Sequence, residues 1–230
     1  FKKLNIWLKD PIPNTSIVLF RICFALVLLI QTYYFIKNGF IEKNIIKPLI
    51  LFPFIEGLHP MSKMNLIILG YVMLISNIGM LINKISRIST LVFLLSFTYF
   101  WILDKGYFNN HYYFISLICF LLVLVDKKSS FKKIICVPRF SLFALQAMIF
   151  IVYFVSGVNK LNPYWLFDLQ PMTHILEVKA QLTNNFLFKE RWVVIFGVYF
   201  GLLFDLFIGF LLFIKRTRVL AFILVFFFNI

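Results

Sequence analysis

The chain has 230 residues, of which 62% are hydrophobic and only 14% are charged, and its mean hydropathy is +0.93. A typical soluble domain carries about a quarter charged residues, so this composition excludes a soluble globular protein and indicates a membrane protein. The net charge of +14 suggests a polyanionic partner, but the Lys and Arg residues stand in short segments between apolar runs. An anionic membrane surface explains this distribution better than nucleic acid, which we do not expect as a partner.

Seven apolar segments are candidates for transmembrane helices, because a bilayer core of ~30 Å requires about 20 apolar residues per helix. They are residues 16–36, 64–82, 88–103, 112–125, 140–158 and 192–214, with a seventh from about 219. The segments 88–103 and 112–125 are short, so they either include flanking residues or form, in part, a re-entrant hairpin. The apolar segment 47–60 contains three prolines, and we expect an interfacial loop packed against the helices. The predicted fold class is an all-α integral membrane protein, a polytopic helical bundle.

Positive charges are distributed unequally over the two sides of this arrangement. Thirteen Lys and Arg residues fall on the side of the N-terminus and nine on the other side, while the acidic residues number two and six. Because cytoplasmic loops carry an excess of Lys and Arg, the N-terminus and the basic loop 127–139 are predicted to be cytoplasmic. The loops around residues 104–111 and 157–165 then both open to the non-cytoplasmic face.

A dense polar cluster, DKGYFNNH, occupies residues 104–111 between two predicted helices. One interpretation is a capped turn, in which Asn109 or Asn110 caps the helix that begins near Tyr112. The other is a polar site that faces a pocket, because an ionisable group at membrane depth is a functional hypothesis by default. For His111 alone, a hydrogen-bonded structural histidine is the commoner outcome. The residues leave both interpretations open.

Lys160 follows an apolar run in the stretch IFIVYFVSGVNKLNPYW, residues 149–165. A lysine at a helix end commonly extends its ammonium to the interface at little cost. In a partly desolvated pocket, by contrast, burial favours the neutral amine, which can accept a proton as a general base. The preceding Ser156-Gly157 pair allows close packing of helices, which suits a pocket wall and equally suits any bundle.

Arg21 and Asp205 lie inside predicted helices, so each should face the bundle interior and find a partner there. Arg21 lies near the cytoplasmic end of its helix, which favours a structural tie. Asp205 lies near the middle of its helix and is the better candidate for lining a cavity. The sequence contains no metal-ligand spacing, no phosphate-binding loop and no nucleophile elbow, and we expect no metal.

The stretches WILDKGYFNNHYYFISL, IFIVYFVSGVNKLNPYW and DLFIGFLLF occur in an order and spacing that closely resemble the vitamin K-dependent gamma-glutamyl carboxylase family. The bacterial branch of that family carries the horizontally transferred transmembrane domain. DPIPNTSIVLFRICFAL resembles the first span of the family. The resemblance runs from about Asp10 to the end of the chain, and it is most specific in the Asn-Asn-His and Gly-Val-x-Lys-Leu motifs.

The resemblance implies an enzyme that couples quinol epoxidation to carboxylation. In that family, a lysine at the position of Lys160 deprotonates vitamin K hydroquinone, oxygenation gives a strong base and finally the quinone epoxide, and a glutamyl side chain is carboxylated with carbon dioxide. The residues matching Asn110 and His111 belong to the same active region. We therefore predict Lys160 and His111 as catalytic residues, with vitamin K hydroquinone or menaquinol as cofactor. The predicted quinone-binding residues are Asp104, Asn109, Asn110, Tyr153 and Asp205.

We expect residues 1–230 to form a single transmembrane domain of a longer protein, trimmed at the N-terminus and continued beyond Ile230. The bias toward Ile, Lys, Asn and Phe is typical of an AT-rich bacterium, which suggests the bacterial inner membrane. The expected partners are membrane lipids, a lipid-soluble quinone and a glutamyl peptide or protein. The alternative function is a non-catalytic membrane module that binds a quinone or a lipid and anchors a fused domain.

Overall fold

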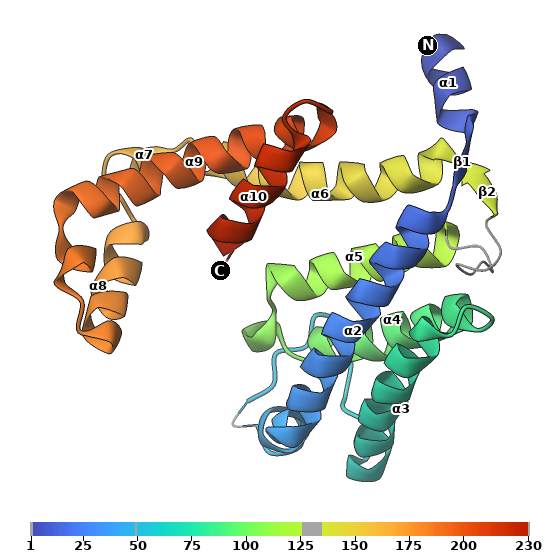
Figure 1. Cartoon of the computed structure of the whole chain (residues 1–230). Coiled ribbons are helices and arrows are strands. Elements are labelled where there is room, and N and C mark those ends of the chain that lie inside the picture. Colours follow the sequence, from blue (N-terminus) through green and yellow to red (C-terminus); the bar gives the residue numbers. More distant parts are fainter. Residues whose placement is uncertain (1, 49, 126–134, 230) are drawn as a thin grey trace. The chain divides into compact units, whose positions relative to one another are not determined.

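The computed structural model describes residues 2–48, 50–125 and 135–229. Figure 1 labels the helices and strands along the chain. The packing divides the chain into an N-terminal unit, Phe1–Leu145, and a C-terminal unit, Gln146–Ile230. The basic residues predicted to face the cytoplasm at positions 127–133 lie outside the described residues.

All seven predicted apolar helices are present. They are α2 Thr15–Lys37, α3 Lys63–Leu81, α4 Ser86–Ile102, α5 Asn110–Val125, α6 Arg139–Asn159, α9 Arg191–Phe213 and α10 Arg218–Asn229. Among the described residues, four helices are long and apolar enough to cross a membrane, namely α2, α3, α6 and α9. The other three are shorter, and the 17 residues of α4 extend over only ~25 Å. The prediction of an all-α membrane protein is confirmed.

Several shorter elements were not predicted from the sequence. They are the helices α1 Lys2–Lys9, α7 Pro163–Leu166 and α8 Met172–Thr183, the π-helix η1 Ile41–Ile46, and the 3-10 turns η2 Lys105–Tyr107 and η3 Phe186–Lys189. Two short strands, β1 Pro11–Pro13 and β2 Cys136–Pro138, pair antiparallel with Ile12 opposite Val137. An ion pair of 3.4 Å between Arg139 Nη2 and Asp10 Oδ2 adds to this pairing, which ties the start of α2 to the start of α6.

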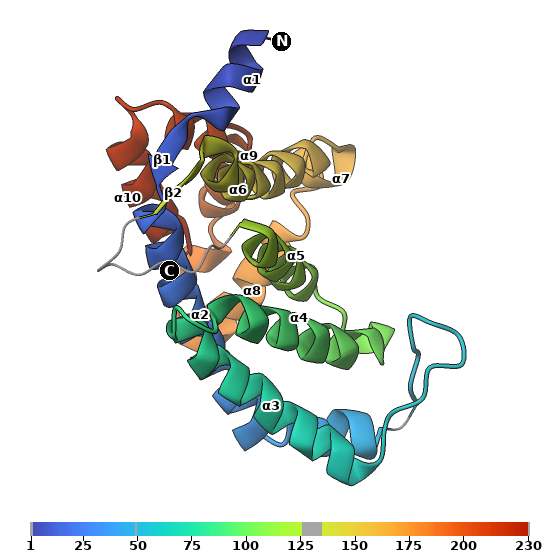
Figure 2. The same cartoon turned by 90° about the vertical axis from the view of Figure 1, so that its right-hand side faces the viewer.

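In the N-terminal unit, α2 packs on α3, α3 on α4 and α4 on α5, and Figure 2 shows α3, α4 and α5 in succession. Asn77 of α3 is fully buried and donates from Nδ2 to the carbonyl of Leu28 at 3.2 Å and to Oγ1 of Thr32 at 2.9 Å on α2. A side chain at Gly79 would collide with Ser89 of α4. Small residues and buried hydrogen bonds stabilise helix packing where lipid removes the hydrophobic force between helices.

Arg21 of α2 is completely buried, as the sequence predicted for a charged residue inside a span. Its guanidinium donates a hydrogen bond to Oδ1 of Asn83, which follows α3. The predicted structural tie is confirmed, because the arginine joins α2 to the connection between α3 and α4.

The proline-rich segment 47–60 has neither helix nor strand in its described part, and it packs on the turn between α4 and α5. The Phe54 amide donates to the Ile102 carbonyl at 2.9 Å, and the Lys105 amide donates to the Phe52 carbonyl at 2.7 Å. The Phe54 ring lies edge-on to Trp101, with centroids 5.5 Å apart. The expectation of a loop packed against the helices is confirmed.

In the C-terminal unit, α9 is the central helix, against which α7, α8 and α10 pack. Phe204 of α9 stacks on Phe228 of α10 with ring centroids 3.8 Å apart. Phe150 of α6 lies edge-on to Phe210 of α9 at 4.9 Å. A Cβ at Gly209 would lie only 2.5 Å from Cδ2 of Phe150, so the absence of a side chain there lets α6 approach α9.

Candidate functional site

Lys160 lies directly after α6, in a turn where its amide donates to the Gly157 carbonyl at 3.1 Å. Its Nζ lies 2.5 Å from Oδ2 of Asp205 on α9, and the two side chains are only 16% and 5% exposed. Ser156 donates from Oγ to the same Oδ2 at 2.6 Å. Residues four apart project from one face of a helix, so the end of α6 directs both donors toward α9. We call Lys160, Asp205 and Ser156 the lysine cluster.

Gly157 makes the contact between Ser156 and Asp205 possible. A Cβ added at Gly157 would lie 2.7 Å from the backbone nitrogen of Leu206, the residue that follows Asp205. Real Cβ atoms do not come so close to a backbone atom, so only glycine permits this distance between α6 and α9. At that distance the short hydroxyl of Ser156 reaches the carboxylate of Asp205 directly.

Trp165 covers a second side of the lysine. Asn162 caps α7 by accepting a hydrogen bond of 2.9 Å from the Trp165 amide, which starts a helical turn at that point. The indole Nε1 donates to the carbonyl of Val198 on α9 at 3.1 Å and so fixes the ring. Lys160 Nζ lies 4.8 Å from the centroid of the indole ring. The face of an indole attracts a cation, so Trp165 and Asp205 both stabilise an ammonium at this position.

The geometry of the lysine cluster differs from that of a lysine that only extends into water. An interfacial lysine keeps its ammonium solvated, whereas the ammonium of Lys160 is mostly buried and held by a buried carboxylate. Removing one partner of a buried ion pair typically costs about 3–5 kcal/mol, because the other charge is left unpaired. Chemically, the lysine of this ion pair holds a proton beside a carboxylate, and it can accept a proton from a ligand only as the neutral amine.

Aromatic side chains adjoin the lysine cluster. Tyr153 lies one turn before Ser156 on α6, and its ring is edge-on to Phe204 of α9 at 5.8 Å. Of the residues predicted from the sequence, the C-terminal unit therefore brings Lys160, Asp205 and Tyr153 into one region, where α6 meets α9.

Asp104 caps a turn in the N-terminal unit and holds the proline-rich segment to it. Its side chain is buried, with 5% of the residue exposed. Oδ1 accepts hydrogen bonds from the Gly106 amide at 2.9 Å and from the Phe52 amide at 3.3 Å. These bonds begin the turn η2 and hold the proline-rich segment on it.

Asn109 caps α5, which begins at Asn110. Its Oδ1 accepts a hydrogen bond from the His111 amide at 2.9 Å and also lies 2.6 Å from His111 Nδ1. The three side chains of Asn109, Asn110 and His111 are exposed. Of the two alternatives for the cap, the structure selects Asn109, and the same oxygen orients the imidazole of His111.

The predicted site residues fall into the two units of the structure. Lys160, Asp205 and Tyr153 belong to the C-terminal unit, and the segment 104–111 belongs to the N-terminal unit. The catalytic and quinone-binding roles of these residues stay predictions.

Two residues of the site were not singled out from the sequence for the role they have here. Ser156 was interpreted only as a small residue for helix packing, although its spacing of four from Lys160 places it on the same helix face. Trp165 was missed: the Asn-Pro pair at 162–163 predicts the start of a short helical turn, but not that this turn brings Trp165 to Lys160.

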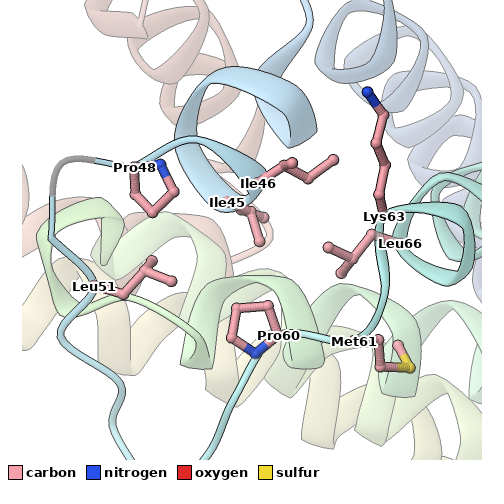
Figure 3. Close-up of a pocket in the computed structure, with 8 residues that line it drawn as sticks. All are labelled: Ile45, Ile46, Pro48, Leu51, Pro60, Met61, Lys63 and Leu66. Atoms are coloured by element: carbon pink, nitrogen blue, oxygen red, sulfur yellow. The ribbon is translucent and has the colours of Figure 1, made fainter.

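A cavity of about 380 Å³ lies in the N-terminal unit, between η1, the proline-rich segment and the start of α3. Figure 3 shows that seven of its eight labelled residues are apolar and that the ammonium of Lys63 points away from Pro60 and Met61. This ammonium lies 3.0 Å from Oε2 of Glu42. None of the predicted site residues lines the cavity. In the described part of the chain, no three His, Cys, Asp or Glu side chains gather in a group that would hold a metal ion.

A family model described as the HTTM domain matches residues 9–230, which is nearly the whole chain. The matched range contains the lysine cluster, Trp165 and the segment 104–111. No solved structure matches the chain.

Proposed function

Because the chain belongs to the HTTM domain family, the domain found in the vitamin K-dependent gamma-glutamyl carboxylase family, we propose that it is an integral-membrane carboxylase and epoxidase. The chain is a membrane domain related to these carboxylases. The proposal adds that it acts on a reduced quinone, vitamin K hydroquinone or menaquinol, and on a glutamyl side chain. Oxygen and carbon dioxide are the proposed co-substrates.

The observation that carries the proposal is the buried contact of Lys160 with Asp205. A general base must bind the proton that it accepts, and the ammonium of Lys160 is stabilised by a carboxylate at 2.5 Å and an indole ring at 4.8 Å. The rings of Tyr153 and Phe204, edge-on to each other with centroids 5.8 Å apart, give the region where α6 meets α9 an aromatic lining. The donor set therefore fits a quinol, which needs a base for its hydroxyl and an apolar wall for its ring.

A bound quinol supplies an acidic hydroxyl and, with oxygen, the chemistry that removes a γ-proton from a glutamyl side chain so that carbon dioxide can add. In the proposed mechanism, Lys160 as the neutral amine accepts the hydroxyl proton at Nζ, and Asp205 and Trp165 hold the ammonium that forms. His111, oriented by Asn109, is the second proposed catalytic residue. Asp104, Asn109, Asn110, Tyr153 and Asp205 are the residues proposed from the sequence to bind the quinone.

The proposed setting is the inner membrane of a bacterium, with the N-terminus in the cytoplasm and the active face on the other side. The basis for this orientation is the excess of Lys and Arg on the side of the N-terminus. Membrane lipids, the quinone and a glutamyl peptide or protein are the proposed partners.

The test is turnover by the purified chain in lipid nanodiscs, supplied with vitamin K hydroquinone or menaquinol, oxygen, labelled carbon dioxide and a glutamyl peptide. Oxygen-dependent formation of the quinone epoxide, with label in the peptide, is the expected result. Epoxide without labelled peptide would support the proposed epoxidase activity and contradict the proposed carboxylation of that peptide. A quinol that binds but stays unaltered with oxygen present would contradict the enzyme and favour the membrane-binding module.

A further inference from the structure

The cavity of about 380 Å³ in the N-terminal unit is lined mainly by apolar side chains. Seven of its eight lining residues are apolar, and two of them, Pro48 and Pro60, lack an amide hydrogen that could donate to a ligand. A buried water molecule needs about two to four polar partners, which the side chains of this lining, apart from Lys63, do not supply. The volume lies at the lower end of the roughly 300–1,000 Å³ of ligand pockets. The cavity therefore suits part of a flexible apolar chain.

The cavity lies at the ends of two long apolar helices. The helix α2 ends at Lys37, the π-helix η1 Ile41–Ile46 follows, and α3 begins at Lys63. Both α2 and α3 are long and apolar enough to cross a bilayer, so we expect their ends at the depth where the hydrocarbon core meets the headgroups. The cavity walls include Ile45 of η1 and Leu66 in the first turn of α3. A lipid whose headgroup lies at this boundary can place part of an acyl chain between these two residues.

The charged side chains around the cavity carry an excess of lysine. Lys63, which lines the cavity, has its Nζ 3.0 Å from Oε2 of Glu42, and Lys47 has its Nζ 3.2 Å from Oε1 of the same carboxylate. One carboxylate does not neutralise two ammonium groups, and the exposed Lys43 on η1 adds a further positive charge. The side chains of Lys47 and Lys63 are 74% and 59% exposed, so both ammonium groups are accessible to an anion.

We propose that this cavity and the lysines beside it bind an anionic phospholipid. The inference goes beyond the proposed function and does not depend on it. The phosphate lies beside Lys47 and Lys63, and part of one acyl chain occupies the cavity. Basic residues near a membrane surface attract anionic lipids, and burial of the chain adds apolar contact. A zwitterionic lipid has the same chains but no net charge, so it gains only the second contribution.

The experiment counts bound lipids by native mass spectrometry of the chain in detergent and needs no turnover. The chain is titrated with phosphatidylglycerol or with phosphatidylcholine of the same acyl chains, and the dissociation constant of the first bound lipid is measured. The wild type should bind phosphatidylglycerol more tightly. Lys63→Gln should weaken this binding about fivefold, which is the effect of one basic residue near an anionic surface. Its affinity for phosphatidylcholine should change little.

Two control variants show whether the effect of Lys63 comes from its charge or from the fold. Glu42→Gln breaks the same ion pairs as Lys63→Gln but keeps both ammonium groups, so it should bind phosphatidylglycerol at least as tightly as the wild type. Lys84→Gln removes an exposed lysine beyond the other end of α3 and should match the wild type.

A second pair of variants tests the cavity. Leu51→Trp places an indole in the cavity from the proline-rich segment and should weaken binding of the first phosphatidylglycerol. Ile50→Trp adds the same side chain at the neighbouring position, which is 66% exposed and does not line the cavity, and it should match the wild type. The helical circular dichroism signal reports whether each variant is folded, and Leu51→Phe replaces Leu51→Trp if the latter loses this signal.

Equal affinity of the wild type for the two lipids would overturn the proposal, because the lysines would then not select the occupant. An unchanged affinity for phosphatidylglycerol in the folded Lys63→Gln or Leu51→Trp variant would overturn it as well, and so would an equal loss in Glu42→Gln. Added menaquinone should not displace the bound phosphatidylglycerol, and displacement would assign the cavity to the quinone instead. A chain that makes no epoxide refutes the proposed enzyme and leaves these lipid affinities unaffected.

Discussion

Lys160 is enclosed by groups from three elements, namely Ser156 on α6, Trp165 on α7 and Asp205 on α9. Each of the three is held by a further contact: Ser156 and Asp205 by each other, and Trp165 by the Val198 carbonyl. Interlocked contacts of this kind restrict the lysine to one place, which is the property that a catalytic amine needs and that a solvated interfacial lysine lacks.

The cap of α5 gives a prediction for a single residue. Asn109→Ala should lower the free energy of unfolding by about 1 kcal/mol, because its oxygen accepts the His111 amide bond at the helix start. Asn110→Ala, at the first helical position, is the matched control and should change stability less. The measurement is denaturant titration of both variants in detergent. Equal losses in the two variants would remove Asn109 as the cap.

The sequence indicated the individual residues of the site better than their contacts. Lys160 and Asp205 were recognisable because a charge within or beside an apolar run needs a partner. Their pairing was not predictable, since 45 residues separate them and the contact depends on how α6 packs on α9. The same holds for Asp104, whose partner Phe52 lies 52 residues earlier. The cap of α5 is a local contact, and the sequence narrowed it to Asn109 or Asn110 without deciding between them.

At the scale of helices, the close approach of α6 and α9 depends on Gly157. Gly157→Ala should lower thermal stability and weaken the contact of Lys160 with Asp205, because the new Cβ would lie 2.7 Å from the Leu206 backbone. Gly197→Ala in α9 is the matched control. Its Cβ would meet only the flexible Met172 side chain at 3.4 Å, and alanine is the better helix former. Thermal unfolding followed by circular dichroism should place Gly157→Ala below the wild type and Gly197→Ala at or above it. The reverse order would contradict the packing described here.

Glu42 connects η1 to α3, and its ion pairs make the stability of the N-terminal unit depend on pH. Hydrogen bonds from Lys63 and then Lys47 lower the pKa of the Glu42 carboxyl below its ordinary value of 4.5. Because the pKa of Glu42 is lowered in the folded chain, its ion pairs stabilise the fold fully at a pH above the ordinary pKa. This stabilisation is lost as the pH falls through the lowered pKa. Both ion pairs are solvent-exposed, so the effect should be small and should decrease with salt.

Hydrogen exchange of the η1 amides, measured while the pH is lowered below 4.5 and corrected for the intrinsic exchange rate, tests this connection. The wild type should lose protection in that window, whereas Glu42→Gln should already be less protected at neutral pH and should change little. Glu56→Gln, at an exposed glutamate in the proline-rich segment, serves as the control and should follow the wild type. Identical curves for Glu42→Gln and the wild type would exclude a contribution from the ion pairs.

The long apolar helices were predictable because length and hydropathy alone define them. The short elements were not, since α1 and α8 have 8 and 12 residues and carry charged residues, as a connection would. The π-helix η1 has no distinct apolar period, and the strands β1 and β2 have three residues each, which is too short for an alternating pattern. Elements stabilised by their surroundings leave little signal in their own sequence.

For the whole molecule, membership of the HTTM domain family and the apolar helices agree on a membrane domain related to the vitamin K-dependent carboxylases. The orientation remains a prediction, and one position before α9 and one after it test it. In a chain with its three cysteines replaced by serine, Lys215→Cys should react with an impermeant maleimide only from the cytoplasm, and Asn184→Cys only from outside. Both positions are exposed. Reversed labelling would invert the topology and put the lysine cluster on the cytoplasmic face.

The central claim is that Lys160 is the base, and the most direct measurement is epoxide yield per enzyme for wild type, Lys160→Ala and Lys160→Arg. Loss of a general base typically lowers the rate ~10²–10⁴-fold, so Lys160→Ala should bind quinol and make almost no epoxide. Lys160→Arg keeps the positive charge beside Asp205, but its guanidinium retains its proton near neutral pH and should fail as well. Helicity and quinol binding are the folding controls. If either folded variant yields as much epoxide as the wild type, Lys160 is not the base.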